Sequence, residues 1–415
     1  MRTIVVLALL LVVGFAGSRG LVARATHRLP LAGLFATGME FFLAGMLLGP
    51  NGFDVITVDV LTHLEPIVYL ALGWIGLLFG VELSWGSARR VSRRVYRFLF
   101  VDTVACVAVV AVLMYLVQRK AWPEWSETGC VVSAVVMGIA AAVGSPTIVT
   151  LVARRLPARG PLTNTMKIAS ALSALFPLLA FGVVFMVLHP RYFAVEGVAV
   201  GLLWWLFLNL VGLVLGLVLV LFTHEWTSDD ELLLLIVGTV LLVGGVCYFL
   251  KFSSLYAAMV TGFVVGNLSR RRDQIFREVH VVEKTLYVGF LVLVGAMVGM
   301  PDWVTIAVAA AYVLGRLATK YAITGAAVSA GFPELRALGR RTGLALSGQG
   351  VMAMAIALDV TLASDAVDLQ RTLTVVALAV LANAPVGLLL TRRVFIASGE
   401  TATRRRVPAK PAEPS

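Results

Sequence analysis

Long apolar runs alternate along this chain with short polar loops. A transmembrane helix needs about 20 apolar residues, and runs of this kind predict about thirteen helices. The chain is therefore expected to be an all-α polytopic membrane protein. The predicted helices cover residues 4–15, 31–48, 64–83, 95–117, 130–152, 162–188, 198–222, 232–250, 254–268, 285–300, 303–324, 343–358 and 373–390.

Two of the predicted helices are interrupted near their centres, by Gly-Ser-Pro-Thr at residues 144–147 and by Ser-Gly-Gln-Gly at residues 347–350. In a bilayer, backbone groups without helical partners are tolerated only where they are buried in protein or line a cavity. Paired broken helices usually frame a transport site, although two packing kinks would give the same pattern. The polar groups offered by these breaks are candidate ligands for an ion, and they belong to Ser145, Thr147, Ser347 and Gln349.

Loop charges predict how the chain crosses the membrane, because cytoplasmic loops carry an excess of Lys and Arg. Arginine-rich loops follow the first, third and fifth predicted helices, and the loops between them are acidic or nearly neutral. This alternation predicts an external N-terminus and a cytoplasmic C-terminus in the plasma membrane. The acidic loop at residues 225–231 disagrees, but acidic residues carry little weight in this rule.

The same count predicts an inverted repeat. If the helix at residues 198–222 is a linker, six helices remain on each side of it with opposite orientations, and the broken helix is the fifth in each half. The first apolar run could instead be a cleaved signal peptide, but a retained helix preserves the six-plus-six arrangement. The proline-containing basic tail, residues 396–415, is expected to be disordered and close to anionic lipid.

Composition agrees with a membrane protein and argues against other classes. The hydrophobic fraction is 60% and the charged fraction 14%, whereas soluble proteins are about 45–50% apolar. The net charge of +11 lies in short loops, so a nucleic-acid partner is not indicated. Three distant cysteines and five scattered histidines suggest no metal or other cofactor. Near the breaks no catalytic triad or phosphate loop indicates an enzyme.

Four charged residues within apolar segments are candidates for a functional role, because charges inside a membrane are costly and usually functional. Arg316 and Lys320 are four residues apart and share one helix face, although both could extend to the cytoplasmic surface. Asp102 has the matching place in the first half and is either their partner or a solvated helix end. Glu40 is a candidate proton carrier, or a carboxyl hydrogen-bonded between helices.

Several short motifs occur in an order that resembles one transporter family. They include Gly-Met-Leu-Leu-Gly-Pro at residues 45–50, Leu-Leu-Phe-Gly-Val-Glu-Leu at 77–83 and Tyr-Ala-Ala-Met-Val-Thr-Gly at 256–262. Together with the two breaks, Gly295-Ala296 and the basic pair, they resemble the monovalent cation:proton antiporter superfamily, the group of sodium/proton and potassium/proton exchangers. The resemblance extends over nearly the whole chain.

The resemblance implies an NhaA-like antiporter fold for residues 1–395. In such a fold, a mobile core of helices at about 95–188 and 303–390 slides against a scaffold made of the remaining helices. It further implies a homodimer in the lipid bilayer that exchanges a monovalent cation for protons by alternating access.

The chain departs from this family at the expected ion site. The helix after the first break carries an Asn-Asp or Asp-Asp pair in the family, and here the pair becomes Ser173 and Ala174, with Ser170 one turn earlier. A serine does not titrate in the working range, so the coupling carboxyl could instead be Asp102 or Glu40. Two alternatives stay open: a small-anion or proton-uncoupled transporter, and a membrane sensor or scaffold that transports nothing.

Overall fold

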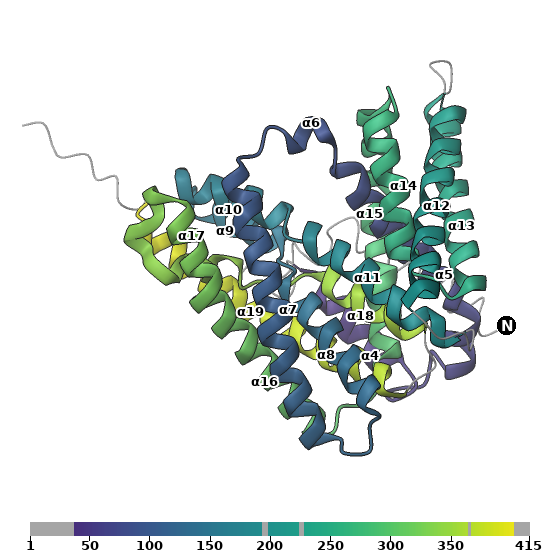
Figure 1. Cartoon of the computed structure of the whole chain (residues 1–415), viewed down its shortest axis with the longest axis horizontal. Coiled ribbons are helices and arrows are strands. Elements are labelled where there is room, and N and C mark those ends of the chain that lie inside the picture. The colour runs from purple at the N-terminus through teal and green to yellow at the C-terminus, as the bar shows by residue number, and fades with distance from the viewer. Residues whose placement is uncertain (1–36, 193–197, 224–227, 364–366, 402–415) are drawn as a thin grey trace, which may run out of the picture.

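The computed structural model describes residues 37–192, 198–223, 228–363 and 367–401, and every regular element in these ranges is a helix (Figure 1). The prediction of an all-α membrane protein is confirmed, because the described residues contain nine helical spans, some made of two or three consecutive elements, that are long and apolar enough to cross a membrane. The first predicted helix lies outside the described residues. The helices are α4 (Met39–Leu48), α5 (Val58–Glu82), α6 (Trp85–Ala88), α7 (Arg93–Ala121), α8 (Glu127–Ala142), α9 (Pro146–Arg155), α10 (Pro161–Ala171), α11 (Leu175–Tyr192), α12 (Val198–Phe222), α13 (Asp229–Leu250), α14 (Ser254–Leu268), α15 (Arg272–Met297), α16 (Trp303–Thr319), η1 (Lys320–Thr324), α17 (Gly325–Gly331), η2 (Pro333–Leu346), α18 (Val351–Leu362) and α19 (Val367–Ala397).

The helices form two groups. In the scaffold group, α14 packs along α5, and α15 packs against α4 and α5, with α12 and α13 alongside. In the core group, α7 packs on α8 and α16, while α19 contacts α8, α9, α16, α18 and η2. The two groups diverge toward α6 and meet around α18 (Figure 1). We refer to the end that carries α6 and the arginine-rich loops as the arginine-rich side.

Some boundaries differ from the sequence prediction. The segment predicted as one helix at 162–188 consists of α10 and α11 with a turn at residues 172–174. The reason is Pro177, which has no N–H to bond the carbonyl of Ser173 and whose ring would clash with that carbonyl. The helix predicted at 285–300 begins much earlier, at Arg272. Its first turns are polar, so a search for apolar runs does not detect them.

The scaffold group depends on close helix contact at glycine. A Cβ atom added to Gly262 of α14 would lie 2.3 Å from the carbonyl oxygen of Leu77 in α5, which is far inside van der Waals contact. Gly262→Ala is therefore expected to destabilise the protein by about 1–3 kcal/mol, because the helices must move apart. Gly238→Ala on α13 is the control, since a Cβ atom there meets nothing within 4 Å. Thermal unfolding of both variants in detergent measures the difference, and equal melting temperatures would contradict this packing argument.

Candidate functional site

The two sequence interruptions are breaks in the structure, and they lie against each other within the core group. Residues 143–145 separate α8 from α9, and residues 347–350 separate η2 from α18, which is bent by 47° relative to η2. A Cβ atom on Gly350 would lie 3.6 Å from the side chain of Ser145. The two non-helical segments therefore pass each other in contact.

Arg316 of α16 holds both breaks together. Its Nε donates to the carbonyl oxygen of Ala141 at 2.8 Å, and its Nη2 donates to those of Val143 at 3.0 Å and Gly348 at 3.2 Å. Its Nη1 donates to the carbonyl oxygen of Ser347. These carbonyls lie at the C-terminal ends of α8 and η2, where a helix has unpaired acceptors and partial negative charge. The fully buried guanidinium therefore supplies hydrogen bonds and charge to both helix ends.

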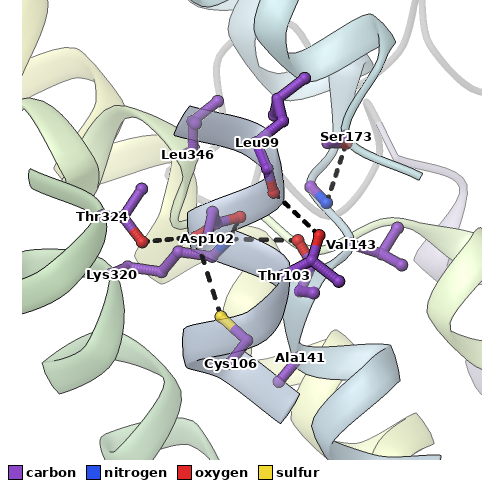
Figure 2. A network of polar contacts seen from close by, with 12 residues as sticks. Leu99, Asp102, Thr103, Cys106, Ala141, Val143, Ser173, Lys320, Thr324 and Leu346 are labelled. Atoms are coloured by element: carbon purple, nitrogen blue, oxygen red, sulfur yellow. Dashed lines mark hydrogen bonds and ion pairs between the residues drawn. The ribbon is translucent and has the colours of Figure 1, made fainter. Parts of the chain in front are cut away.

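Lys320 and Asp102 form a buried ion pair beside this crossing (Figure 2). The Lys320 Nζ lies 2.6 and 2.8 Å from the two Asp102 carboxylate oxygens, and it also donates to the carbonyl oxygen of Ala142 at 3.1 Å. Thr324 donates a hydrogen bond to the same carboxylate. Because one partner alone would be an uncompensated buried charge, the two side chains depend on each other.

The local helix geometry explains how both donors reach Asp102. The segment Lys320–Thr324 is a single π-helical turn at the end of α16, and such turns often occur at functional sites. The expectation that Lys320 could extend to the surface is wrong, since the side chain is buried, and so is the alternative of Asp102 as a solvated helix end. The proposed pairing of these two residues is confirmed as a contact.

Ser173 lies at the turn between α10 and α11 and contacts the first break (Figure 2). Its hydroxyl accepts a hydrogen bond from the Gly144 N–H at 3.1 Å and donates to the carbonyl oxygen of Ser170 at 2.7 Å. Ser173 therefore satisfies one backbone donor that the break leaves without a helical partner. The hydroxyl of Ser173 thus fixes the backbone at the first break.

The other predicted ligands of the first break are placed differently. Ser145 is buried and does not cap α9 with its side chain, while Thr147 is exposed. The Ser170 hydroxyl donates within its own helix to the carbonyl oxygen of Lys167 at 3.0 Å. Of these three residues, Ser145 alone has its side chain at the contact between the two breaks.

The second break is held by a neutral hydrogen-bond network. Gln349 donates to the carbonyl oxygen of Ala140 at 2.9 Å and to the hydroxyl of Tyr312 at 2.8 Å, and its side-chain oxygen accepts from Asn383 at 3.0 Å. The hydroxyl of Ser347 is buried without a hydrogen-bond partner. Gln349 thus ties α8, α16 and α19 to the break, as a polar side chain at a helix break is expected to do.

Glu40 lies away from the two breaks. It is in the first described turn of α4, which packs on α15 in the scaffold group. Its Oε2 is buried and has no hydrogen-bond partner. Of the two carboxyls that the sequence proposed as substitutes for the missing pair, the structure brings Asp102 to the site and leaves Glu40 in the scaffold.

Three polar residues were not anticipated from the sequence. Asn383 binds Gln349, Thr324 binds Asp102, and Asp359 is fully buried in α18. Asp359 and Asn383 did carry a signal, because each is a single polar residue within a long apolar run. Thr324 carried none, since threonine is common in membrane helices and only the π-helical turn directs it to the carboxylate.

A bundle in which two broken helices cross beside buried charges has the architecture of a secondary transporter. The sequence profile described as "Sodium/hydrogen exchanger, transmembrane" matches residues 4–395. The chain therefore belongs to this family, which consists of transporters and not of enzymes.

A solved structure has a similar fold. The sodium proton antiporter MjNhaP1 from Methanocaldococcus jannaschii is 16% identical to this chain, and the match covers 95% of this chain and 99% of that chain with a TM-score of 0.63. No curated protein matches the chain significantly. At this identity the solved structure establishes the antiporter fold that the sequence predicted.

Proposed function

We propose that this protein exchanges a monovalent cation, Na⁺ or K⁺, for protons by alternating access, and that Asp102 is its coupling carboxylate. The observation that supports the proposal is the buried Asp102–Lys320 pair next to two crossed helix breaks. The acidic pair that usually binds the ion is missing, and Asp102 supplies a carboxylate close to the first break. The two are linked by Lys320, whose Nζ bonds both the Asp102 carboxylate and the carbonyl oxygen of Ala142, the last residue of α8.

The ion pair suggests how coupling works without a second carboxylate. A cation and the Lys320 ammonium are alternative partners of the same Asp102 oxygens. If a cation takes the place of Lys320, the ammonium loses its counter-charge in a buried position, which is costly. Release of the Lys320 proton removes that cost. Uptake of one cation would then be linked to release of one proton.

The arrangement of the two helix groups supports alternating access. They diverge on the arginine-rich side and are joined by hydrogen bonds on the opposite side, where the Tyr69 hydroxyl donates to the carbonyl oxygen of Leu362 at 3.2 Å. We further propose that the arginine-rich side is cytoplasmic in the plasma membrane, that the core group moves against the scaffold group, and that the protein is a homodimer. An inverted six-helix repeat remains part of this proposal.

A small-anion carrier is less well supported. Its motivation was the excess of basic residues, but Arg316 directs its donors at carbonyl oxygens and Lys320 is paired with Asp102. Neither basic side chain is therefore available to bind an anion in this arrangement. A non-transporting sensor or scaffold is an outcome that the following experiment can reveal.

Proteoliposomes with an internal pH dye and an imposed proton gradient test the proposed function. Addition of sodium, lithium or potassium is expected to change the dye signal in the wild type, and Asp102→Asn is expected to abolish the response. Glu40→Gln is the matched control and should respond normally, because Glu40 lies in the scaffold. Ser173→Ala should respond with a reduced rate, since it loses one hydrogen bond at the break.

Either of two results would contradict the proposal. A folded wild type that responds to no cation would exclude proton-coupled cation exchange and favour the anion carrier or the sensor. A wild-type response that persists in Asp102→Asn would retain the exchange activity but remove Asp102 from it.

A further inference from the structure

A second buried carboxylate, Asp359, lies where the core and scaffold groups meet on the side opposite the arginine-rich loops. It is in α18, nine residues after Gly350, or roughly 13 Å along the helix at 1.5 Å per residue. Its side chain is fully buried. The residue is therefore separate from the Asp102 site, although both are on helices that adjoin the crossing.

Asp359 faces the N-terminus of α14, a scaffold helix. The Ser253 hydroxyl, which caps α14 by accepting from the Tyr256 N–H at 2.9 Å, donates to Oδ2 of Asp359. The other carboxylate oxygen, Oδ1, is buried and has no hydrogen-bond partner. The backbone N–H groups of Ser254 and Leu255, in the first turn of α14, lie close to this carboxylate but form no hydrogen bond with Oδ1. One oxygen of a buried carboxylate is thus left without a bonded donor.

No ion pair joins Asp359 to a cation within the described part of the chain. Two other titratable groups face this region. On α13 the group near Asp359 is the Cys247 thiol, and on α5 it is Tyr69, whose hydroxyl donates to the carbonyl oxygen of Leu362. The Lys251 ammonium next to this region is paired with Glu65 at 3.0 Å. On α19, Arg371 pairs with Glu124 at the surface. An ionised Asp359 would therefore be a buried charge without a counter-charge.

Hydrogen bonds between the groups are concentrated around Asp359. Besides the bond to Ser253, Tyr69 of α5 donates to the carbonyl oxygen of Leu362, and Gln370 of α19 donates to that of Met297 at the end of α15. If the core group moves as proposed, these bonds break. Water would then reach Asp359 from this side.

We propose that Asp359 is a proton-binding site that locks the two groups together on the side opposite the arginine-rich loops. It holds a proton while this contact is closed, and it loses the proton to water on that side when the contact opens. The inference rests on the proposed alternating access. Because the proton enters and leaves on one side, Asp359 regulates transport without carrying protons across the membrane.

The direction of the effect follows from linkage. The closed contact binds the proton and the open contact releases it, so acidification of that side favours the closed state. One linked proton changes the ratio of closed to open protein by up to about tenfold per pH unit. The transport rate should therefore fall as that side becomes acidic, and it should recover as the pH rises.

Transport at varied pH on that side, with the other side held constant, tests the site. Asp359→Asn is expected to transport at a rate that no longer depends on this pH, since the asparagine keeps a hydrogen bond to Ser253 but cannot titrate. Glu65→Gln is the matched control, a carboxyl near the same contact whose partner is Lys251, and it should keep the wild-type dependence. An active Asp359→Asn variant with the wild-type dependence would overturn the proposal.

A labelling experiment decides the question even if no cation is transported. Leu362→Cys places a thiol in the contact, because the Leu362 side chain is buried there. Its reaction with a membrane-impermeant methanethiosulfonate from that side should rise with pH more steeply when Asp359 is present than in the Asp359→Asn background. Equal pH dependence in both backgrounds would refute the lock. A steeper dependence in a protein without exchange activity would support the lock and reject the proposed transport function.

Discussion

Lys320→Met is expected to destabilise the protein by about 3–5 kcal/mol, because it leaves Asp102 as a buried charge without its partner. Methionine has a similar length, so the loss reports the charge and not a cavity. Thermal unfolding of purified protein in detergent is the measurement. The proteoliposome assay should show no cation-dependent proton movement, since Lys320 is the proposed source of the exchanged proton.

Two further variants make this prediction specific. Adding Asp102→Asn to Lys320→Met should recover much of the lost stability, because both charges are then removed and a buried pair is often replaced at little cost. Lys167→Met, at an exposed lysine on α10, should change stability by less than about 0.5 kcal/mol. If Lys320→Met unfolded at the same temperature as Lys167→Met, the Asp102–Lys320 ion pair would not stabilise the folded protein.

Much of the fold could be predicted because a bilayer imposes a simple length rule. Every predicted helix from the second onward has a counterpart among the described residues. Both central breaks were predicted, since Pro146 removes a backbone donor and the two glycines around Gln349 weaken a helix. The turn at 172–174 was missed. Pro177 has the same effect there, but the uninterrupted apolar character concealed it.

Part of the site could be predicted for a different reason. A charge within an apolar run is costly and therefore conspicuous, which drew attention to Arg316, Lys320 and Asp102. Their partners depend on which helices pack together, and one sequence does not reveal this. The carbonyl oxygens that bind Arg316 have no side-chain signal. Asp359 carried the same signal as the other charges but lies just past the end of the helix predicted at 343–358, and its contact with Ser253 in the other helix group is not visible in the sequence.

Arg316→Lys is expected to lower the rate of cation-dependent proton movement by at least about tenfold although it conserves the charge. The guanidinium is a planar fork that bonds carbonyls of both breaks at once, whereas an ammonium is a compact point charge with three donors. Lysine at this position can reach one break or the other. Hydrogen bonds to a charged group contribute about 1.5–3 kcal/mol each, so losing two of them should also lower the stability by about 3 kcal/mol or more.

The control for Arg316→Lys is Arg154→Lys, at an exposed arginine on α9 in the same helix group, which should transport normally. The informative comparison is between the two readouts. Reduced stability together with normal transport would mean that Arg316 only supports the fold, whereas loss of transport with nearly normal stability would mean that the position of the two breaks limits the exchange itself. The network predicts that both readouts fall, because the same guanidinium donates to α8 carbonyls on one side and to carbonyls of the second break on the other.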